Sequence, residues 1–105
     1  MNEELEEFIK NNFSHTGDAL DLGCGDGKDL DGLRRMGWSC KGVDILTGTD
    51  LNNFHIFKKD HFDLIYSNYV IHKLDNCSNF IKTIIANLKP GGGVFLCRLS
   101  TKMTR

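Results

Sequence analysis

The stretch ALDLGCGDG, residues 19–27, decides the fold of this chain. Its first four residues favour a short strand, and Gly23, Gly25 and Gly27 follow at alternate positions. Glycine permits a sharp turn and lets a ligand approach bare backbone. The helix expected next adds unpaired N–H groups at its N-terminus. A strand, a glycine loop and a helix in this order predict the ligand-binding loop of an α/β fold.

Segments with strand and helix patterns alternate on both sides of this loop. Apolar runs predict strands over residues 19–22, 38–45, 62–66 and 94–99. Apolar residues at helical spacing predict helices over residues 2–13, from the glycine loop to Gly37, and from a Ser78 cap to the turn at residues 89–92. Short helical turns are expected within residues 46–61 and 69–74. The third long helix is expected to bury Ile81, Ile84, Ile85 and Leu88.

This alternation argues for a parallel sheet covered by helices on both faces, in a single domain over residues 1–105. Sheets of this type bind ligands beyond the carboxyl ends of their strands, where the strand order reverses. Gly23 follows the first predicted strand, Asp44 the second, and Ser67 and Asn68 the third. Their convergence at one edge predicts a binding site there.

Composition and charge narrow the class of partner. The 105 residues carry a net charge of −1, which gives no reason to expect nucleic acid or an anionic membrane as the main partner. Residues 1–50 hold eleven acidic and five basic side chains. We interpret this imbalance as a solvated surface rather than a face that steers a partner.

The cysteines and the apolar runs indicate the cellular compartment of the protein. The four cysteines form no CxxC pair and show no metal-like spacing with histidine, so we expect reduced thiols and no metal site. The longest purely apolar run, residues 94–97, is far shorter than a membrane span. The N-terminus begins with acidic residues, unlike a signal peptide. We therefore expect a cytoplasmic protein.

Two ligand classes compete for the glycine loop. A dinucleotide-binding loop has the spacing GxGxxG, whose last glycine permits close packing of the helix on the strand. Counted from Gly23, that position is Lys28, and the spacing present is GxGxG. A nicotinamide-dependent oxidoreductase is therefore disfavoured.

Four segments in order along the chain carry a resemblance to a known family. They are LDLGCGDG at 20–27, GVDI at 42–45, FDLIYSN and VIHKL within 62–74, and NLKPGG at 87–92. These segments resemble four motifs of the class I S-adenosylmethionine-dependent methyltransferases. The resemblance implies a three-layer, Rossmann-like α/β domain with a small, mostly parallel sheet flanked by helices. That sheet, with its strands in the order 2-1-3-4, is truncated relative to the usual seven-stranded methyltransferase fold.

The resemblance also implies S-adenosyl-L-methionine as cofactor and S-adenosyl-L-homocysteine as product. Asp21 would help to hold the ammonium group of the cofactor, and Asp44 would accept hydrogen bonds from its ribose hydroxyls. The other implied cofactor-binding residues are Gly23, Cys24, Gly25, Gly27, Ile45, Asp50, Leu51, Ser67 and Asn68. Alternatives stay open, because Asp44 could merely end a strand and Ser67 and Asn68 could form a simple turn.

The implied function is methyl transfer to a small-molecule acceptor. Such a reaction depends mainly on alignment of the nucleophile with the methyl group, so a general base is optional. His72, just past the third predicted strand, is the candidate catalytic residue that could orient or deprotonate the acceptor. A histidine bonded to backbone in a helical turn is the alternative for His72.

The chain is shorter than the family pattern in two places. Residues 46–61 are too few for the helix and strand that the family usually inserts there, and only residues 100–105 follow the last predicted strand. An exposed edge strand invites pairing, so we expect residues 94–99 to meet a second copy or a partner protein. A non-catalytic cofactor-binding or scaffolding module is therefore the alternative to an enzyme.

Overall fold

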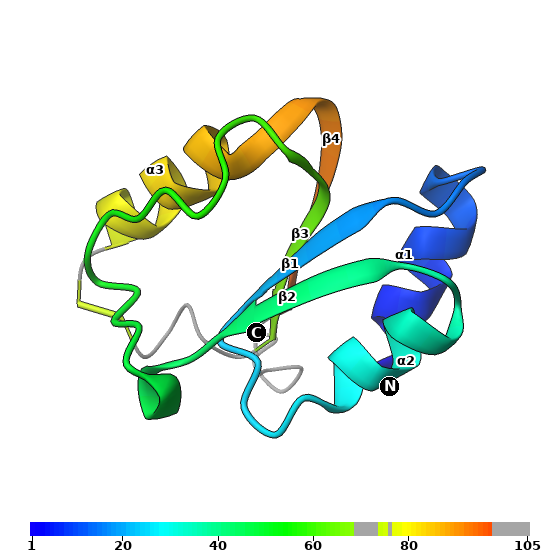
Figure 1. The fold of residues 1–105 in the computed structure, drawn as a ribbon, viewed down its shortest axis with the longest axis horizontal. Helices are drawn as coiled ribbons and strands as arrows, with labels where there is room; N and C mark the ends of the chain where they lie inside the picture. The colour runs from blue at the N-terminus through cyan, green and yellow to red at the C-terminus, as the bar shows by residue number, and fades with distance from the viewer. Residues whose placement is uncertain (69–73, 76, 98–105) are drawn as a thin grey trace, which may run out of the picture.

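A computed structural model describes residues 1–68, 74–75 and 77–97 of the chain (Figure 1). Within these residues, three α-helices and four strands alternate, with one short 3-10 helix. In chain order they are α1 (Glu3–Asn12), β1 (Asp18–Leu22), α2 (Lys28–Arg35), β2 (Ser39–Val43), the 3-10 helix η1 (Ile45–Thr47), β3 (Phe62–Asn68), α3 (Cys77–Asn87) and β4 (Leu88–Cys97).

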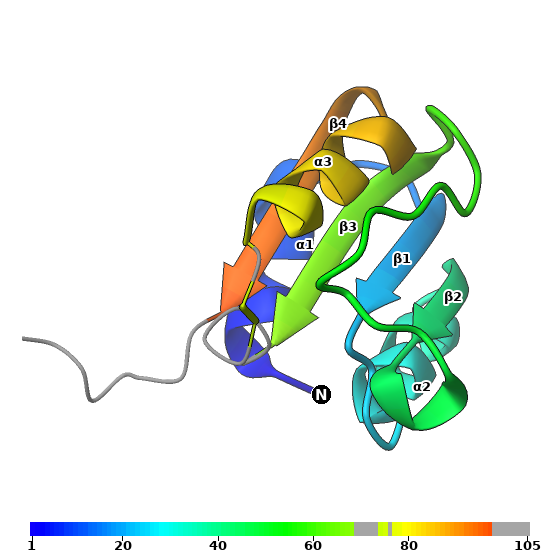
Figure 2. The same cartoon turned by 90° about the vertical axis from the view of Figure 1, so that its left-hand side faces the viewer.

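The four strands form one parallel sheet in the order β2-β1-β3-β4, which confirms the predicted order. Helices α1 and α2 cover one face of this sheet and α3 covers the other (Figure 2). Because the strands are parallel, all four end at the same edge of the sheet. The expected Rossmann-like α/β architecture is therefore present, with helices on both sides of a small sheet.

Each face of the sheet has its own core because alternate residues of a strand point to opposite faces. On one face Leu5 of α1 and Leu33 of α2 pack with Leu64 of β3. On the other face Leu22 of β1 and Phe80 of α3 pack in a second cluster. The sheet is thus buried on both sides, as expected for parallel strands.

Helix α3 buries a different face from the predicted one. Ile81 and Ile85 are 48% and 68% exposed, and Leu88 belongs to β4 rather than to the helix. Its buried residues are Phe80, Thr83, Ile84 and Asn87. The helix already begins at Cys77, so Ser78 lies inside it and is not its cap. The apolar pattern predicted the wrong face of α3 because two of the buried residues are polar, and both of these side chains are hydrogen-bonded.

Asn87 explains how the irregular segment before β3 is held. Its Oδ1 accepts hydrogen bonds from the backbone N–H groups of Phe57 at 2.7 Å and Lys58 at 2.9 Å. Its Nδ2 donates to the carbonyl oxygens of His55 at 2.9 Å and Thr83 at 2.7 Å. Backbone polar groups inside a fold need hydrogen-bond partners, and here the Asn87 side chain supplies the partners that a helix or strand would otherwise supply.

The remaining differences from the sequence prediction lie at the ends of elements. Strand β2 stops at Val43, and Ile45 begins the 3-10 helix that stands for the expected helical turn. Strand β4 begins at Leu88, six residues earlier than predicted, and a register shift opposite β3 accommodates residues 89–92. The predicted turn at residues 69–74 falls almost entirely outside the described residues.

Strand β4 is the outermost strand beyond β3, and one of its side chains, Leu96, is 43% exposed. Its inner face is covered, because the Phe95 ring lies 5.4 Å from that of Phe8 in α1. Cys24 and Cys40 are free thiols. Within the described part of the chain, no helix has the length and apolar character needed to cross a membrane.

We predict that Asn87→Ala destabilises the fold by about 3–5 kcal/mol, because it leaves several backbone groups around the buried Asn87 side chain without their partner. The matched control is Asn12→Ala, which removes one exposed hydrogen bond to the Phe8 carbonyl oxygen and should cost less than about 1 kcal/mol. Urea unfolding of the two variants measures both values. Equal losses for the two variants would contradict the role assigned to Asn87.

Candidate functional site

Two adjoining cavities open at the edge where the strands end, on the two sides of the glycine loop. Their volumes are about 670 and 520 Å³, and both are lined by Gly23, Gly25 and Asp44. Of the residues predicted to bind cofactor, the larger cavity also has Asp21, Cys24 and Asn68. The smaller cavity also has Ile45, Asp50 and Leu51. Nine of the eleven predicted residues therefore gather around two connected spaces of a size that suits a small ligand.

The glycine loop turns through left-handed backbone at each of its glycines. Gly23, Gly25 and Gly27 have φ angles of 88°, 55° and 83°, which other residues rarely adopt. The N–H groups of Gly23 and Cys24 both donate to the Val43 carbonyl oxygen, at 2.8 and 2.9 Å. The loop is thereby tied to the end of β2. Gly27 lines neither cavity and serves instead to begin α2.

Gly42 of β2 makes room for this loop, a role that the sequence analysis missed. A Cβ atom at Gly42 would lie 2.5 Å from Leu30 Cδ1 and 2.9 Å from Cys24 Sγ. A side chain at this position would force the Leu30 and Cys24 side chains to shift. The glycine before the second-motif valine was the available signal, but only the packing reveals its purpose.

Asp44 points toward the glycine loop. Its Oδ2 accepts a hydrogen bond from the Gly25 N–H at 2.9 Å, and its Oδ1 accepts one from the Leu46 N–H at 2.9 Å. The side chain is half-buried, and none of the ion pairs found among the described residues involves it. Because each carboxylate oxygen can accept more than one hydrogen bond, Asp44 can hold the loop and still bind ligand hydroxyls.

Asp21 is the most unusual side chain of the site. It is 1% exposed, lines the larger cavity, and lies beside Tyr66 across the β1–β3 pair. The two side chains interact, but neither Asp21 Oδ1 nor Tyr66 Oη has a hydrogen-bond partner of good geometry. Burial raises the pKa of the Asp21 carboxyl most, Tyr66 lowers it and the negative charges of Asp29 and Asp44 raise it, so that the pKa is about 7.

A buried carboxyl without a full set of partners is costly, and it is stabilised best by a cation. Perturbed groups of this kind in a cavity are typical of functional sites. The position of Asp21 therefore suits a ligand that brings a positive charge to the floor of the larger cavity.

The side chains of Ser67 and Asn68 have different surroundings in the structure. The buried Ser67 hydroxyl donates to the Leu22 carbonyl oxygen at 2.8 Å and lines neither cavity, so its side chain closes the strand end. Asn68 lines the larger cavity and donates from Nδ2 to Asp29. The sequence had left a binding role and a turn role open for both residues, and their placement now differs.

Residues 1–4, which we call the N-terminal wall, line the larger cavity as well. Asn2 holds the wall in place, because its backbone N–H donates to Asp29 Oδ1 at 2.8 Å and its Nδ2 donates to Asn68 Oδ1 at 3.0 Å. Its own Oδ1 caps α1 at the Glu4 and Leu5 N–H groups. The sequence signals the cap, but contacts across 27 and 66 residues are not readable from it.

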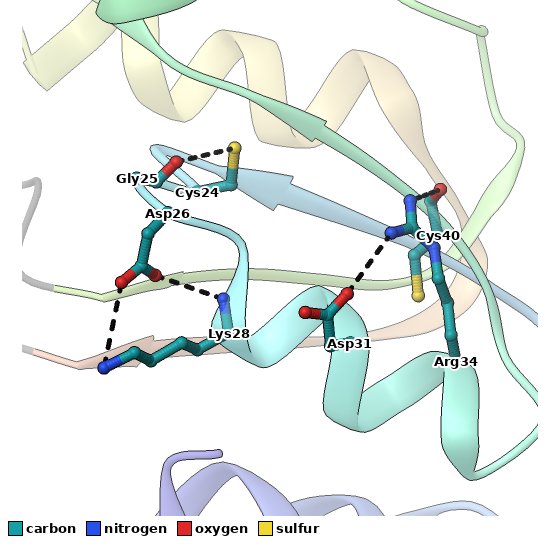
Figure 3. A network of polar contacts seen from close by, with 7 residues as sticks. All are labelled: Cys24, Gly25, Asp26, Lys28, Asp31, Arg34 and Cys40. Carbon is teal, nitrogen blue, oxygen red and sulfur yellow. Dashed lines mark hydrogen bonds and ion pairs between the residues drawn. The ribbon is translucent and has the colours of Figure 1, made fainter.

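The single basic side chain among the described residues of the larger cavity is already engaged. Lys28 Nζ lies 3.8 Å from Asp26 Oδ2, and the Lys28 N–H donates to Asp26 Oδ1 at 3.2 Å (Figure 3). His72, the predicted catalytic residue, lies outside the described residues. No cluster of three or more metal-binding side chains occurs in the described ranges.

The comparisons with known proteins agree with this geometry. No curated protein and no solved structure matches the chain. A family described as "Methyltransferase domain" matches residues 1–103, nearly the whole length of the chain. With the parallel sheet, the glycine loop and the acid after β2 in place, the chain belongs to this methyltransferase domain family.

Proposed function

We propose that this protein is an S-adenosyl-L-methionine-dependent methyltransferase that acts on a small-molecule acceptor. The observation that carries the proposal is the buried Asp21 carboxyl, whose Oδ1 has no hydrogen-bond partner, in the cavity beside the glycine loop. The cofactor contains an ammonium group, and a carboxylate is the natural partner for it. Membership of the methyltransferase domain family supports the reaction type.

We expect the ammonium end of the cofactor to lie in the larger cavity and its adenine end in the smaller cavity. Asp21 would bind the ammonium group in the larger cavity, and Asp44, which lines both, would accept hydrogen bonds from the ribose hydroxyls. Ile45 and Leu51 give the smaller cavity an apolar lining that suits an adenine ring. The bare backbone of Gly23 and Gly25 lies between the two ends.

When bound, the cofactor supplies an electrophilic methyl group. The chain then has to place an acceptor atom in line with that group and exclude water, which needs no buried general base. His72 remains the candidate for orienting or deprotonating the acceptor. The product left in the site would be S-adenosyl-L-homocysteine.

A non-catalytic cofactor-binding module is the second candidate, and the outermost position of β4 favours it. Pairing of this edge with a second copy or a partner protein stays a prediction. Formation of a methylated product by the purified chain would decide for the enzyme over the module.

We predict that the protein binds S-adenosyl-L-homocysteine in calorimetric titration and does not bind NADH. Asp44→Ala should weaken S-adenosyl-L-homocysteine binding by at least about tenfold, because it removes the acceptors for the ribose and the hydrogen bonds from the Gly25 and Leu46 N–H groups.

The matched control for Asp44→Ala is Asp31→Ala on the exposed side of α2, which lines neither cavity and should leave the affinity unchanged. Tight binding of NADH, or equal affinities of the two variants, would overturn the proposed function.

We also predict that Asp21→Asn abolishes S-adenosyl-L-homocysteine binding yet stabilises the protein at pH 8. The Asp21 pKa is about 7 in the folded state and near 3.8 in the unfolded state, so the folded state binds the proton more tightly. The contribution of Asp21 to stability is therefore present below pH 4 and is lost as the pH rises to 7.

The difference in unfolding free energy between Asp21→Asn and the unmodified protein should grow over this pH range to the order of 3 kcal/mol. Urea unfolding at several pH values measures it. A difference that does not change with pH would show that the Asp21 carboxyl is not strained by burial.

A further inference from the structure

Three side chains from distant parts of the chain form a closed ring of hydrogen bonds at the N-terminal wall. The Asn2 backbone N–H donates to Asp29 Oδ1 at 2.8 Å, and Asn2 Nδ2 donates to Asn68 Oδ1 at 3.0 Å. The ring closes because Asn68 Nδ2 donates to the other carboxylate oxygen, Asp29 Oδ2. We call these three residues the clasp. They lie before α1, in α2 and at the end of β3, so the clasp joins three separate segments.

A second contact seats the wall on α2. A Cβ atom at Gly32 would lie 2.7 Å from Met1 Sδ and 2.9 Å from Met1 Cβ. The Met1 side chain therefore occupies the space that a larger residue at position 32 would need. Gly32 follows Asp29 by three positions, so both lie on one side of α2. The wall is thus held against this helix by a polar contact and by an apolar one.

The clasp borders the cavity in which the ammonium end of the cofactor is proposed to bind. Asn2, Asp29 and Asn68 all line the larger cavity, together with Asp21 and the glycine loop. A ligand that fills this cavity is therefore bounded both by the strand ends and by the wall. If residues 1–4 moved away, the cavity would lose this part of its lining.

The packing of α1 does not depend on the clasp. Leu5 and Ile9 hold the helix on the sheet, and they are 0% and 3% exposed. The helix cap is also separate from the clasp, because it uses Asn2 Oδ1 rather than Nδ2. The clasp instead fixes the position of the N-terminal wall, which is the part of this segment that lines the cavity.

The direction of the hydrogen bonds explains why position 2 holds an asparagine. Aspartate caps a helix as well as asparagine does, so the cap would accept either residue. An ionised carboxylate cannot donate, however, and Asp29 already accepts from Asn68. Asn68 therefore turns its Oδ1 toward Asn2, and only a donor at position 2 can bond to it. The oxygen of the Asn2 side chain serves the cap, and its nitrogen serves the clasp.

We propose that the clasp holds the N-terminal wall against the larger cavity and slows the release of the bound cofactor. Asp29 is the positioning residue, because it accepts hydrogen bonds from both asparagines and acts on the ligand through the wall. This inference rests on the proposed function, since the ligand that is retained is the cofactor of that reaction. Loosening the clasp raises the dissociation rate, while Asp21 and Asp44 stay in place.

The dissociation rate of S-adenosyl-L-homocysteine from the immobilised full chain, measured by surface plasmon resonance, tests the proposal. Asn2→Asp keeps an oxygen that caps α1 but loses the donor to Asn68. We expect release to become about fivefold to tenfold faster. Asn2→Ser also keeps a cap and lacks the donor, without adding a charge, so we expect the same acceleration.

An exchange of side chains between positions 2 and 29 gives the sharper test. Asp29→Asn alone breaks one bond of the clasp, because one carboxylate oxygen becomes an NH₂ group, and it should accelerate release as well. In the double variant Asn2→Asp with Asp29→Asn, the Asn68 amide can turn over. Its Nδ2 then donates to position 2, and its Oδ1 accepts from position 29. All three bonds are restored, so the dissociation rate should return to within about twofold of the original value.

The matched control makes the same two exchanges away from the clasp. Asn12 of α1 and Asp31 of α2 are exposed and line neither cavity. Asn12→Asp and Asp31→Asn, separately and together, should leave the dissociation rate unchanged. Circular dichroism of each variant verifies that it is folded, and Asn2→Ser decides the test by itself if Asp29→Asn does not fold.

The outcomes separate the two proposals. Failure of the unmodified protein to bind S-adenosyl-L-homocysteine would overturn the proposed function and this inference with it. If the ligand binds, three results would overturn only the role of the clasp. These are an unchanged dissociation rate in Asn2→Ser, a double variant that releases the ligand as fast as the single ones, and an equal acceleration in the control variants.

Discussion

The structure depends on the way the glycine loop is fastened to the end of β2. The Val43 carbonyl oxygen accepts the N–H groups of Gly23 and Cys24, and the Asp44 carboxylate accepts that of Gly25. These bonds place the loop between the two cavities and turn Asp44 toward both. The close approach is possible because Gly42 has no side chain. Without this fastening the backbone would not present a defined surface to a ligand.

A second constraint is electrostatic. The fold places an aspartate with a pKa of about 7 at the floor of a cavity with an acidic wall, an arrangement that works against the stability of the protein by itself. Natural proteins retain such strain where a ligand relieves it. The positive charge of the proposed cofactor would lower the free energy of this cavity.

The shortening of the chain between β2 and β3 is compensated by a side chain rather than by secondary structure. Asn87 satisfies backbone groups of the irregular segment that leads into β3, and His55 bonds back to the Asp50 carbonyl oxygen at 2.8 Å. The segment therefore keeps Asp50 and Leu51 at the smaller cavity although a helix and a strand are lacking. A sheet of four strands can thus still bring these residues together at one edge.

The sequence by itself determined the alternation of strands and helices and the convergence of Gly23 and Asp44, because these follow from apolar periodicity and from short-range motifs. The strand order was implied by the resemblance of four segments to methyltransferase motifs. It did not determine which face α3 buries, the placement of Ser67, or the N-terminal wall. These features depend on partners distant in the chain, such as Asn2 with Asn68 or Asn87 with Phe57. Only the tertiary structure decided them, because the burial and the hydrogen-bond partners of a side chain depend on the residues that the fold places around it.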